Sequence, residues 1–327
     1  MPTLNPASRT SASQVAPPGS LLDIEHLPVS EITKIFDSAA QLQSALTKPA
    51  SRAQLLKSLS GRRVALLFYE ASTRTRVSFE MAAKNLGAFT TVVTAAASSI
   101  EKGESLVDTG YTIEATGAEA IVMRHPSSGA AALLARHINV PLVNAGDGMH
   151  EHPTQALLDA FTILQHKKKL EGLHVLVVGD VFHSRVARSN VQLLSKFGAR
   201  VTLCGSESLL PRLAATLAPG VVVSRDFDAE LKSADVIMML RVQKERLAGL
   251  DLNLNDYIAQ YQLHGERLRS AKRGAIVMHP GPMIRGMEIT AEVADGPQSA
   301  IVEQVRNGVV VRMAILARAF EMQRGAR

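Results

Sequence analysis

Short apolar runs rich in Val and Ile alternate with segments of helical periodicity along most of this 327-residue chain. Apolar runs of this kind, separated by helices, are typical of parallel strands that helices cover on both faces of a sheet. The expected strands span residues 64–68, 90–93, 120–123, 142–144, 175–178, 201–204, 221–223, 236–240 and 276–278, with helices such as 76–86, 128–137, 155–165 and 186–197 between them. The sequence therefore predicts an α/β fold.

The length of the chain indicates two domains, because a single core rarely grows beyond about 300 residues. We expect two doubly wound parallel-sheet domains joined by interdomain helices, at residues 21–155 and 156–299. The apolar spacing in residues 300–327 predicts a long helix that packs back on the first domain. Residues 1–20, rich in Ser, Thr, Ala and Pro, are expected to form a disordered tail. In this fold class ligands bind beyond the carboxyl ends of the strands, so the site is expected in the cleft between the domains.

The segment Ser72-Thr73-Arg74-Thr75-Arg76 follows the first expected strand and opens a helix. The unpaired N–H groups and the dipole of a helix start attract a phosphate, and arginine adds a planar fork that can grip it. Because the segment lacks the glycines of a nucleotide-binding loop, it favours a small phosphorylated compound. The alternative is an ordinary capped helix with two solvated arginines.

Further polar clusters stand where other expected strands end. They are Arg124-His125-Pro126, the loop 144–148 with His152 and Gln155 beyond it, Gly179-Asp180 with His183 and Arg185, Arg241 with Gln243, and His279 with the stiff loop Pro280-Gly281-Pro282. Each cluster alone also fits a surface residue or a simple turn. Strand ends of this fold class converge on one cleft, so together the clusters indicate a single site.

The charge pattern suits a pocket for small anions. The net charge is +6, yet the arginines above stand singly, and the chain has no Trp to stack nucleic-acid bases. No apolar run reaches the length of a membrane span, and the start lacks the apolar centre of a signal peptide. The single Cys204 excludes an internal disulfide and fits a reducing compartment. We expect a cytoplasmic protein without nucleic-acid or membrane partners.

Five motifs together resemble the carbamoyltransferase family. They are residues 72–76, Met123 to Pro126, His152-Pro153-Thr154-Gln155, Arg241-Val242-Gln243 and His279-Pro280. Three features resemble the aspartate-specific members rather than the ornithine-specific ones: residues 101–104, residues 241–243, and a His279-Pro280 pair without the Cys that the ornithine enzymes carry there. The resemblance runs from about Leu21 to the terminal helix. Gly281 departs from it, because some members have Leu at this position.

The resemblance implies roles for individual residues. Ser72, Thr73, Arg74, Thr75 and Arg124 would hold the phosphate of carbamoyl phosphate, and His152, Arg124 and Thr75 would donate hydrogen bonds to its carbonyl oxygen. Gln155 and the backbone of Pro280, Gly281 and Pro282 would orient its amine, and Arg185, Arg241 and Gln243 would bind aspartate. Ser98 and Lys102 would enter the site of an adjacent subunit, so the site would lie partly at the subunit interface of a homotrimer.

The implied activity is transfer of the carbamoyl group to the amine of L-aspartate, giving N-carbamoyl-L-aspartate and phosphate, an early step of pyrimidine synthesis. No cofactor and no metal are implied, although regulatory or dihydroorotase-like chains are conceivable partners. Alternatives are another amino acid such as ornithine, an inactive structural homologue, a metal-dependent amidohydrolase and a dehydrogenase. The amidohydrolase rests on His150-Glu151-His152 alone, and Gly179 lacks the glycine pattern of a dinucleotide site. An inactive homologue would be expected to have lost Arg74, Lys102, His152 or Arg241.

Overall fold

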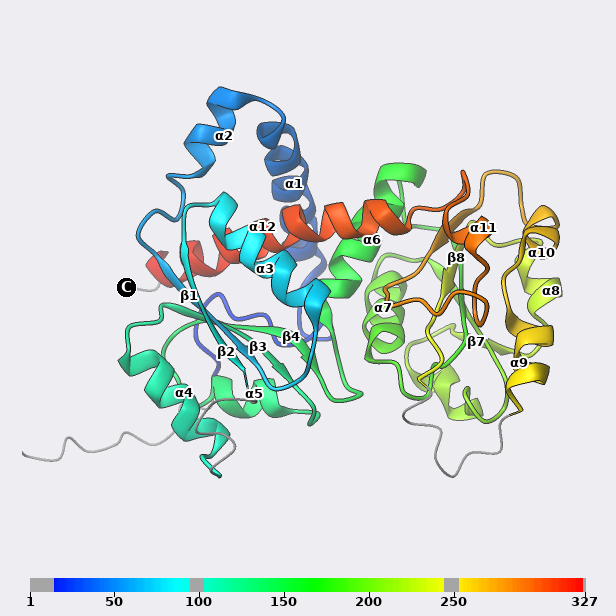
Figure 1. Ribbon diagram of the computed structural model, residues 1–327, viewed down its shortest axis with the longest axis horizontal. Coiled ribbons are helices and arrows are strands. Elements are labelled where there is room, and N and C mark those ends of the chain that lie inside the picture. Colours follow the sequence, from blue (N-terminus) through cyan, green and yellow to red (C-terminus); the bar gives the residue numbers. More distant parts are fainter. Residues whose placement is uncertain (1–14, 95–102, 244–252, 326–327) are drawn as a thin grey trace, which may run out of the picture.

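The computed structural model describes residues 15–94, 103–243 and 253–325. It contains two parallel sheets, each with helices around it, and Figure 1 shows them at opposite ends of the molecule. The predicted α/β class with two parallel-sheet domains is confirmed. None of the helices in the described ranges has the length and apolar composition needed to cross a membrane.

The first sheet has the strand order β2-β1-β3-β4. Its strands are β1 (Arg63–Phe68), β2 (Phe89–Thr94), β3 (Ala120–His125) and β4 (Leu142–Asp147), and the helices beside them are α3 (Thr73–Asn85), α4 (Leu106–Ala115) and α5 (Ala130–Ala135). Strand β4 is buried along its whole length, and β1 is buried beyond its first residue, as the continuous apolar runs predict. The edge strand β2 is largely exposed.

The second sheet has the order β7-β6-β5-β8-β9. Its strands are β5 (His174–Val178), β6 (Arg200–Cys204), β7 (Val222–Ser224), β8 (Val236–Met239) and β9 (Ile276–Met278). Around it lie α7 (Arg185–Lys196), η2 (Arg212–Thr216), α8 (Phe227–Leu231), α9 (Leu254–Tyr261), α10 (Gly265–Arg269) and α11 (Ala291–Ala294). In both sheets, the chain adds strands outward to one edge and then returns to continue on the other side of the first strand, which is the doubly wound pattern.

Two long helices, α6 (Pro153–Lys167) and α12 (Ile301–Gly325), join the halves (Figure 1). Helix α12 packs against α6, α3 and the N-terminal helix α1 (Val29–Leu46), which is followed by α2 (Pro49–Leu55). One core cluster includes residues of both sheets together with α1, α6 and α12. The predicted return of the terminal helix to the first half therefore agrees with its packing on α1 and α3.

The packed chain begins before residue 21, where the sequence analysis ends the disordered tail. The Ser20 hydroxyl accepts a hydrogen bond from the N–H of Leu142 (3.0 Å), and Pro17 is buried. Gly19 lies so close to α12 that a Cβ would come within 2.4 Å of the Ala319 carbonyl oxygen. These contacts hold residues 17–20 in place. Residues 1–14 of the predicted tail lie outside the described residues.

Candidate active site

A cavity of about 500 Å³ opens between the two sheets, at the carboxyl ends of their central strands. Its lining comes from both halves of the chain: Ser72, Thr73, Arg74, Thr75, Arg124, His152, Gln155, Arg185, Arg241, Gln243, Pro280, Gly281 and Pro282. The described residues to which the resemblance gives a role in substrate binding therefore line one cavity. Ser98 and Lys102 lie outside the described residues.

The N-terminus of α3 forms one wall. Strand β1 ends at Phe68, and Ser72 in extended conformation precedes the first helical residue, Thr73. No side chain caps this helix start through a hydrogen bond in the structure, so its first N–H groups point at the cavity without that competition. A helix start lined by Thr75 and by the guanidinium of Arg74 is suited to a phosphate.

Glu70, just before this helix, links two arginines from different halves. Its Oε2 lies 3.0 Å from Nε of Arg124, near the end of β3, and accepts a hydrogen bond (2.6 Å) from Nη2 of Arg185, the first residue of α7. Burial and the nearby Arg185 lower the pKa of Arg124 to about 10, so it remains a cation at neutral pH. The sequence analysis missed Glu70. Its only distinguishing feature in the sequence is its position between the first strand and residues 72–76.

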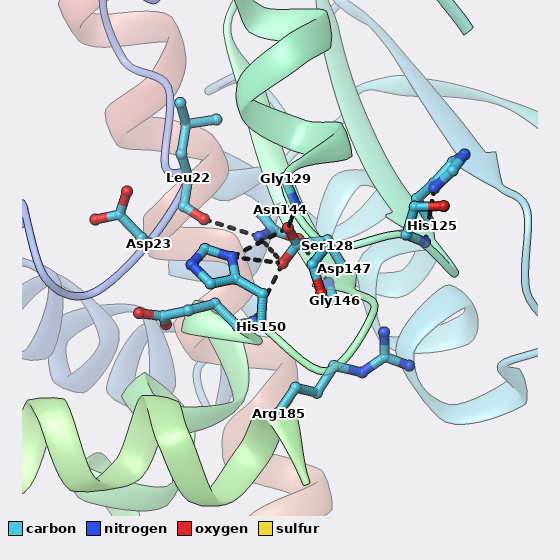
Figure 2. Close-up of polar contacts among 12 residues, drawn as sticks. Leu22, Asp23, His125, Ser128, Gly129, Asn144, Gly146, Asp147, His150 and Arg185 are labelled. Atoms are coloured by element: carbon cyan, nitrogen blue, oxygen red, sulfur yellow. Dashed lines mark hydrogen bonds and ion pairs between the residues drawn. The ribbon is translucent and has the colours of Figure 1, made fainter. Parts of the chain in front are cut away.

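The loop after β4 is held by the carboxylate of Asp147 (Figure 2). Asp147 accepts hydrogen bonds from the N–H of Gly129 (2.7 Å) and from Asn144 Nδ2 (2.9 Å), and lies 3.1 Å from His150 Nδ1. Gly146 has φ +118°, and a Cβ there would come within about 3.3 Å of the guanidiniums of Arg124 and Arg185. This network fixes the loop that leads to His152 and lets two arginines approach the backbone.

His152 lies at the start of α6 and is buried at the cavity wall. Burial and three guanidiniums, those of Arg124, Arg312 and Arg185, lower its pKa well below the usual range, so the imidazole is neutral at pH 7. The Thr154 hydroxyl lies 3.5 Å from Nδ1, which leaves Nε2 for the cavity. A neutral imidazole can donate one hydrogen bond to a carbonyl oxygen without losing its proton.

The second half presents Arg241 and Gln243 just after β8. The N–H of Gln243 donates to Asp180 (3.3 Å), and its side-chain amide donates to the carbonyl oxygen of His183 (3.1 Å). Arg241 faces Arg74 across the cavity closely enough to contribute, after burial, to lowering the pKa of Arg74. Two guanidiniums held near each other across a cavity favour an anion between them.

The loop after β9 meets Arg74. The N–H of Gly281 donates to His279 Nδ1 (2.8 Å), and Gly281 has φ +69°. A Cβ at Gly281 would come within 2.8 Å of the Arg74 guanidinium. Gly281 therefore lies directly against the Arg74 guanidinium, the end of a flexible side chain that a larger residue at position 281 would displace.

Arg312 of α12 is a further cavity residue that the sequence analysis missed. It is buried, donates to the Ser78 hydroxyl (2.7 Å) and lies over the Phe79 ring. Little in the sequence marks Arg312 as a site residue, because it is a single arginine within an apolar helix pattern. Among the described residues, no group of three or more His, Cys, Asp or Glu is arranged to hold a metal, and His150 Nδ1 lies 3.1 Å from Asp147.

Family models and known relatives agree with this geometry. Residues 20–165 match the carbamoyl-P binding domain of aspartate/ornithine carbamoyltransferase, and residues 171–319 match its Asp/Orn binding domain. The aspartate carbamoyltransferase catalytic subunit of Koribacter versatilis is 60% identical over 91% of this chain and 96% of its own length. That of Solibacter usitatus is 53% identical over 93% and 99%.

Solved structures are similar over the same span. Aspartate transcarbamoylase from Trypanosoma cruzi, in complex with carbamoyl aspartate and phosphate, has a TM-score of 0.83 at 33% identity, covering 91% of this chain and 95% of that one. The catalytic subunit of the M. jannaschii enzyme has a TM-score of 0.82 at 35% identity, covering 94% and 99%. The chain therefore belongs to the aspartate/ornithine carbamoyltransferase family.

Proposed function

We propose that this chain transfers the carbamoyl group of carbamoyl phosphate to the amine of L-aspartate, giving N-carbamoyl-L-aspartate and phosphate. The observation that carries the proposal is a single cavity with a helix N-terminus and Arg74 on one side and Arg241 and Gln243 on the other. Two anionic substrates need several cations to offset their mutual repulsion. The reaction is an early step of pyrimidine synthesis. The relatives from Koribacter versatilis and Solibacter usitatus are named aspartate carbamoyltransferase, the enzyme that carries out this reaction.

The phosphate of the donor lies at residues 72–75, with Arg124 beside it. His152, Arg124 and Thr75 donate hydrogen bonds to the carbonyl oxygen, where negative charge develops as the amine attacks. Each such donor is typically worth about 10²–10³ in rate. The new C–N bond forms, the C–O bond to phosphate breaks, and the departing phosphate takes the amine proton. The neutral state of His152 supports this role, because it donates without acting as an acid.

The acceptor binds through Arg185, Arg241 and Gln243. An arginine at 241 attracts the side-chain carboxylate of aspartate and repels the ammonium of ornithine, which argues for aspartate as acceptor. The Trypanosoma cruzi relative was crystallised with carbamoyl phosphate and aspartate, which supports the same pair of substrates here. The cavity keeps Arg74, His152 and Arg241 together, which argues against an inactive homologue.

We assign donor binding to residues 21–155 with the returning helix 300–327, and acceptor binding to residues 156–299. We also propose a homotrimer in which Ser98 and Lys102 of one copy complete the site of the next. Exposed apolar side chains on α3 and β2, among them Val77, Met81 and Phe89, support a subunit contact near that segment. The cytoplasmic location rests on the single buried Cys204.

The purified protein should form carbamoyl aspartate and phosphate from carbamoyl phosphate and aspartate. Ornithine, tested in parallel, should give a rate at least about 10²-fold lower, because its side-chain ammonium would lie next to the like charge of Arg241. Molecular mass in solution should correspond to three chains. Equal rates with both amino acids would contradict the aspartate assignment, and a monomeric active protein would contradict the shared site.

A further inference from the structure

A buried carboxylate, Asp159, lies one helical turn after Gln155 on α6 and reaches no solvent. Three side-chain amides donate to it: Gln155 Nε2 to Oδ1 (2.9 Å), Gln304 Nε2 to Oδ1 (2.8 Å) and Asn190 Nδ2 to Oδ2 (2.9 Å). The donors come from α6, α12 and α7, so the carboxylate stands where the two halves of the molecule meet.

This contact determines which end of the Gln155 amide is left for the cavity. A carboxylate only accepts hydrogen bonds, so Gln155 must turn its NH₂ toward Asp159. The carbonyl oxygen Oε1 is then the polar atom that Gln155 offers to the cavity it lines. An oxygen there can accept a hydrogen bond from an NH₂ group of a ligand, whereas it gains nothing from a methyl group in the same place.

The same carboxylate oxygen also supports the loop after β9. Gln304, which donates to Asp159 Oδ1, accepts through its own Oε1 a hydrogen bond from the N–H of His279 (2.9 Å). His279 in turn accepts from the N–H of Gly281. The two groups assigned to the carbamoyl amine, the Gln155 side chain and the 280–282 backbone, are therefore both connected to one atom.

We propose that Asp159 is the positioning residue that makes the site selective for a carbamoyl group over an acyl group of the same shape. The inference rests on the proposed function, since it concerns the donor substrate of that reaction. Asp159 touches no substrate and acts through the Gln155 amide. In a site without this acceptor, the side-chain amide of Gln155 can rotate. Its oxygen is then no longer fixed where it accepts a hydrogen bond from the carbamoyl amine.

The cost of burying Asp159 supports a role beyond packing. Burial raises the pKa of Asp159 to about 6, which means that the surroundings oppose its charged form even with three donors present. The two carboxylate oxygens accept from donors on α6, α7 and α12, and the nearby cavity residue Arg312 favours the charged form of Asp159.

The test compares carbamoyl phosphate with acetyl phosphate, which has a methyl group in place of the amine. For each variant of the intact protein, the half-saturating concentration of carbamoyl phosphate is measured, and acetyl phosphate is measured as its competitor. Asp159→Leu removes the acceptor and keeps the branching at Cγ. We expect the preference for carbamoyl phosphate to fall about tenfold, the usual effect of one hydrogen bond. Gln155→Met should show the same reduced preference, because it removes the amide itself.

Asp159→Ser provides a second variant that is more tolerant of the buried setting. Its short hydroxyl does not reach Gln155 Nε2, so the preference should fall in the same way. Thr162→Val is the matched control: it removes the hydroxyl that accepts from Asn307 (2.9 Å) in the same α6–α12 contact, outside the cavity lining. It should weaken packing and leave the preference unchanged.

The outcomes separate the inference from the proposed function. If the wild-type protein forms carbamoyl aspartate and a folded Asp159→Leu or Asp159→Ser variant keeps the wild-type preference, the positioning role is refuted. The same holds if Thr162→Val lowers the preference as much as Asp159→Leu does. If the wild-type protein forms no carbamoyl aspartate, the proposed function itself fails, whatever the variants show.

Discussion

The two halves of the cavity hold their ligand-facing groups in different ways. On the side of the first sheet, these groups are the main-chain N–H groups of α3 and buried side chains such as His152 and Gln155, and Gln155 is held by a second buried group. On the side of the second sheet, Arg241 and Gln243 follow β8 and are partly exposed. Recognition of the donor therefore combines main-chain groups and buried side chains with the exposed Arg74, whereas recognition of the acceptor depends on side chains alone. Such a division allows the acceptor to change while the donor site stays the same.

The largest expected effect tests the first half. Arg74→Ala should lower kcat/KM by about 10²–10³, because it removes a cation from the position where the leaving phosphate is held. Steady-state kinetics measure the loss, and circular dichroism verifies that the fold is kept. Lys84→Ala, at the other end of α3 and paired with Glu80, is the control and should retain activity. Near-normal kinetics in folded Arg74→Ala would contradict the donor site.

The second prediction concerns the edge of the acceptor side. Arg241→Ala should raise the half-saturating aspartate concentration about 10- to 100-fold, the range for a lost charged hydrogen bond, and should lower turnover. Carbamoyl phosphate binding, measured by calorimetry, should change little. The exposed Arg212 on η2 provides a control, since Arg212→Ala removes an equal charge from the same half. An unchanged aspartate response would show that Arg241 has a structural role alone.

Glu70 tests whether the two halves depend on each other. Glu70→Gln keeps the shape but removes the charge between Arg124 and Arg185, so the two cations repel each other. We expect kcat/KM to fall about tenfold for both substrates, in contrast to the selective effect at Arg241. Glu119→Gln is a matched control, because Glu119 also pairs with two arginines, at the start of β1 away from the cavity. A loss confined to one substrate would show that the halves act independently.

A smaller effect is expected when two inactive chains are mixed. Lys102→Ala and His152→Ala should each be inactive alone. In a trimer that holds both kinds of chain, one junction brings an intact Lys102 to an intact His152, so activity should return to about a third of the wild-type level. Subunit exchange is verified by mass spectrometry. Hybrids that form but stay inactive would place the whole site within one chain.

The family and the fold class were predictable from the sequence, because apolar runs report burial directly and the motifs stand at strand ends. Gln155 and residues 280–282 could be identified because they belong to these motifs. What holds them was not predictable: Asp159 and Gln304 are far apart in the sequence, and nothing local marks their contact. Glu70 was missed because its two partners come from different sheets.

The smallest expected effect concerns the loop that supports His152. The hydrogen bond with Asp147 raises the pKa of His150, so the charged imidazole stabilises the fold at low pH. This contribution is complete below the ordinary value of about 6.5 and is lost as the pH rises through the raised value. The His150 side chain is 48% exposed, so the loss should stay below about 1 kcal/mol.

Unfolding by urea at pH 6 and pH 8 should therefore show that the wild-type protein loses stability relative to His150→Gln as the pH rises. The control is His137→Gln, since the His137 ring contacts the carbonyl oxygen of Leu133 instead of a carboxylate. Activity should not change, because Asn144 and the N–H of Gly129 continue to hold Asp147. If His150→Gln instead lost activity, the support of this loop would depend on one exposed side chain. The first half would then rely on an exposed side chain, as the second half relies on the partly exposed Arg241 and Gln243.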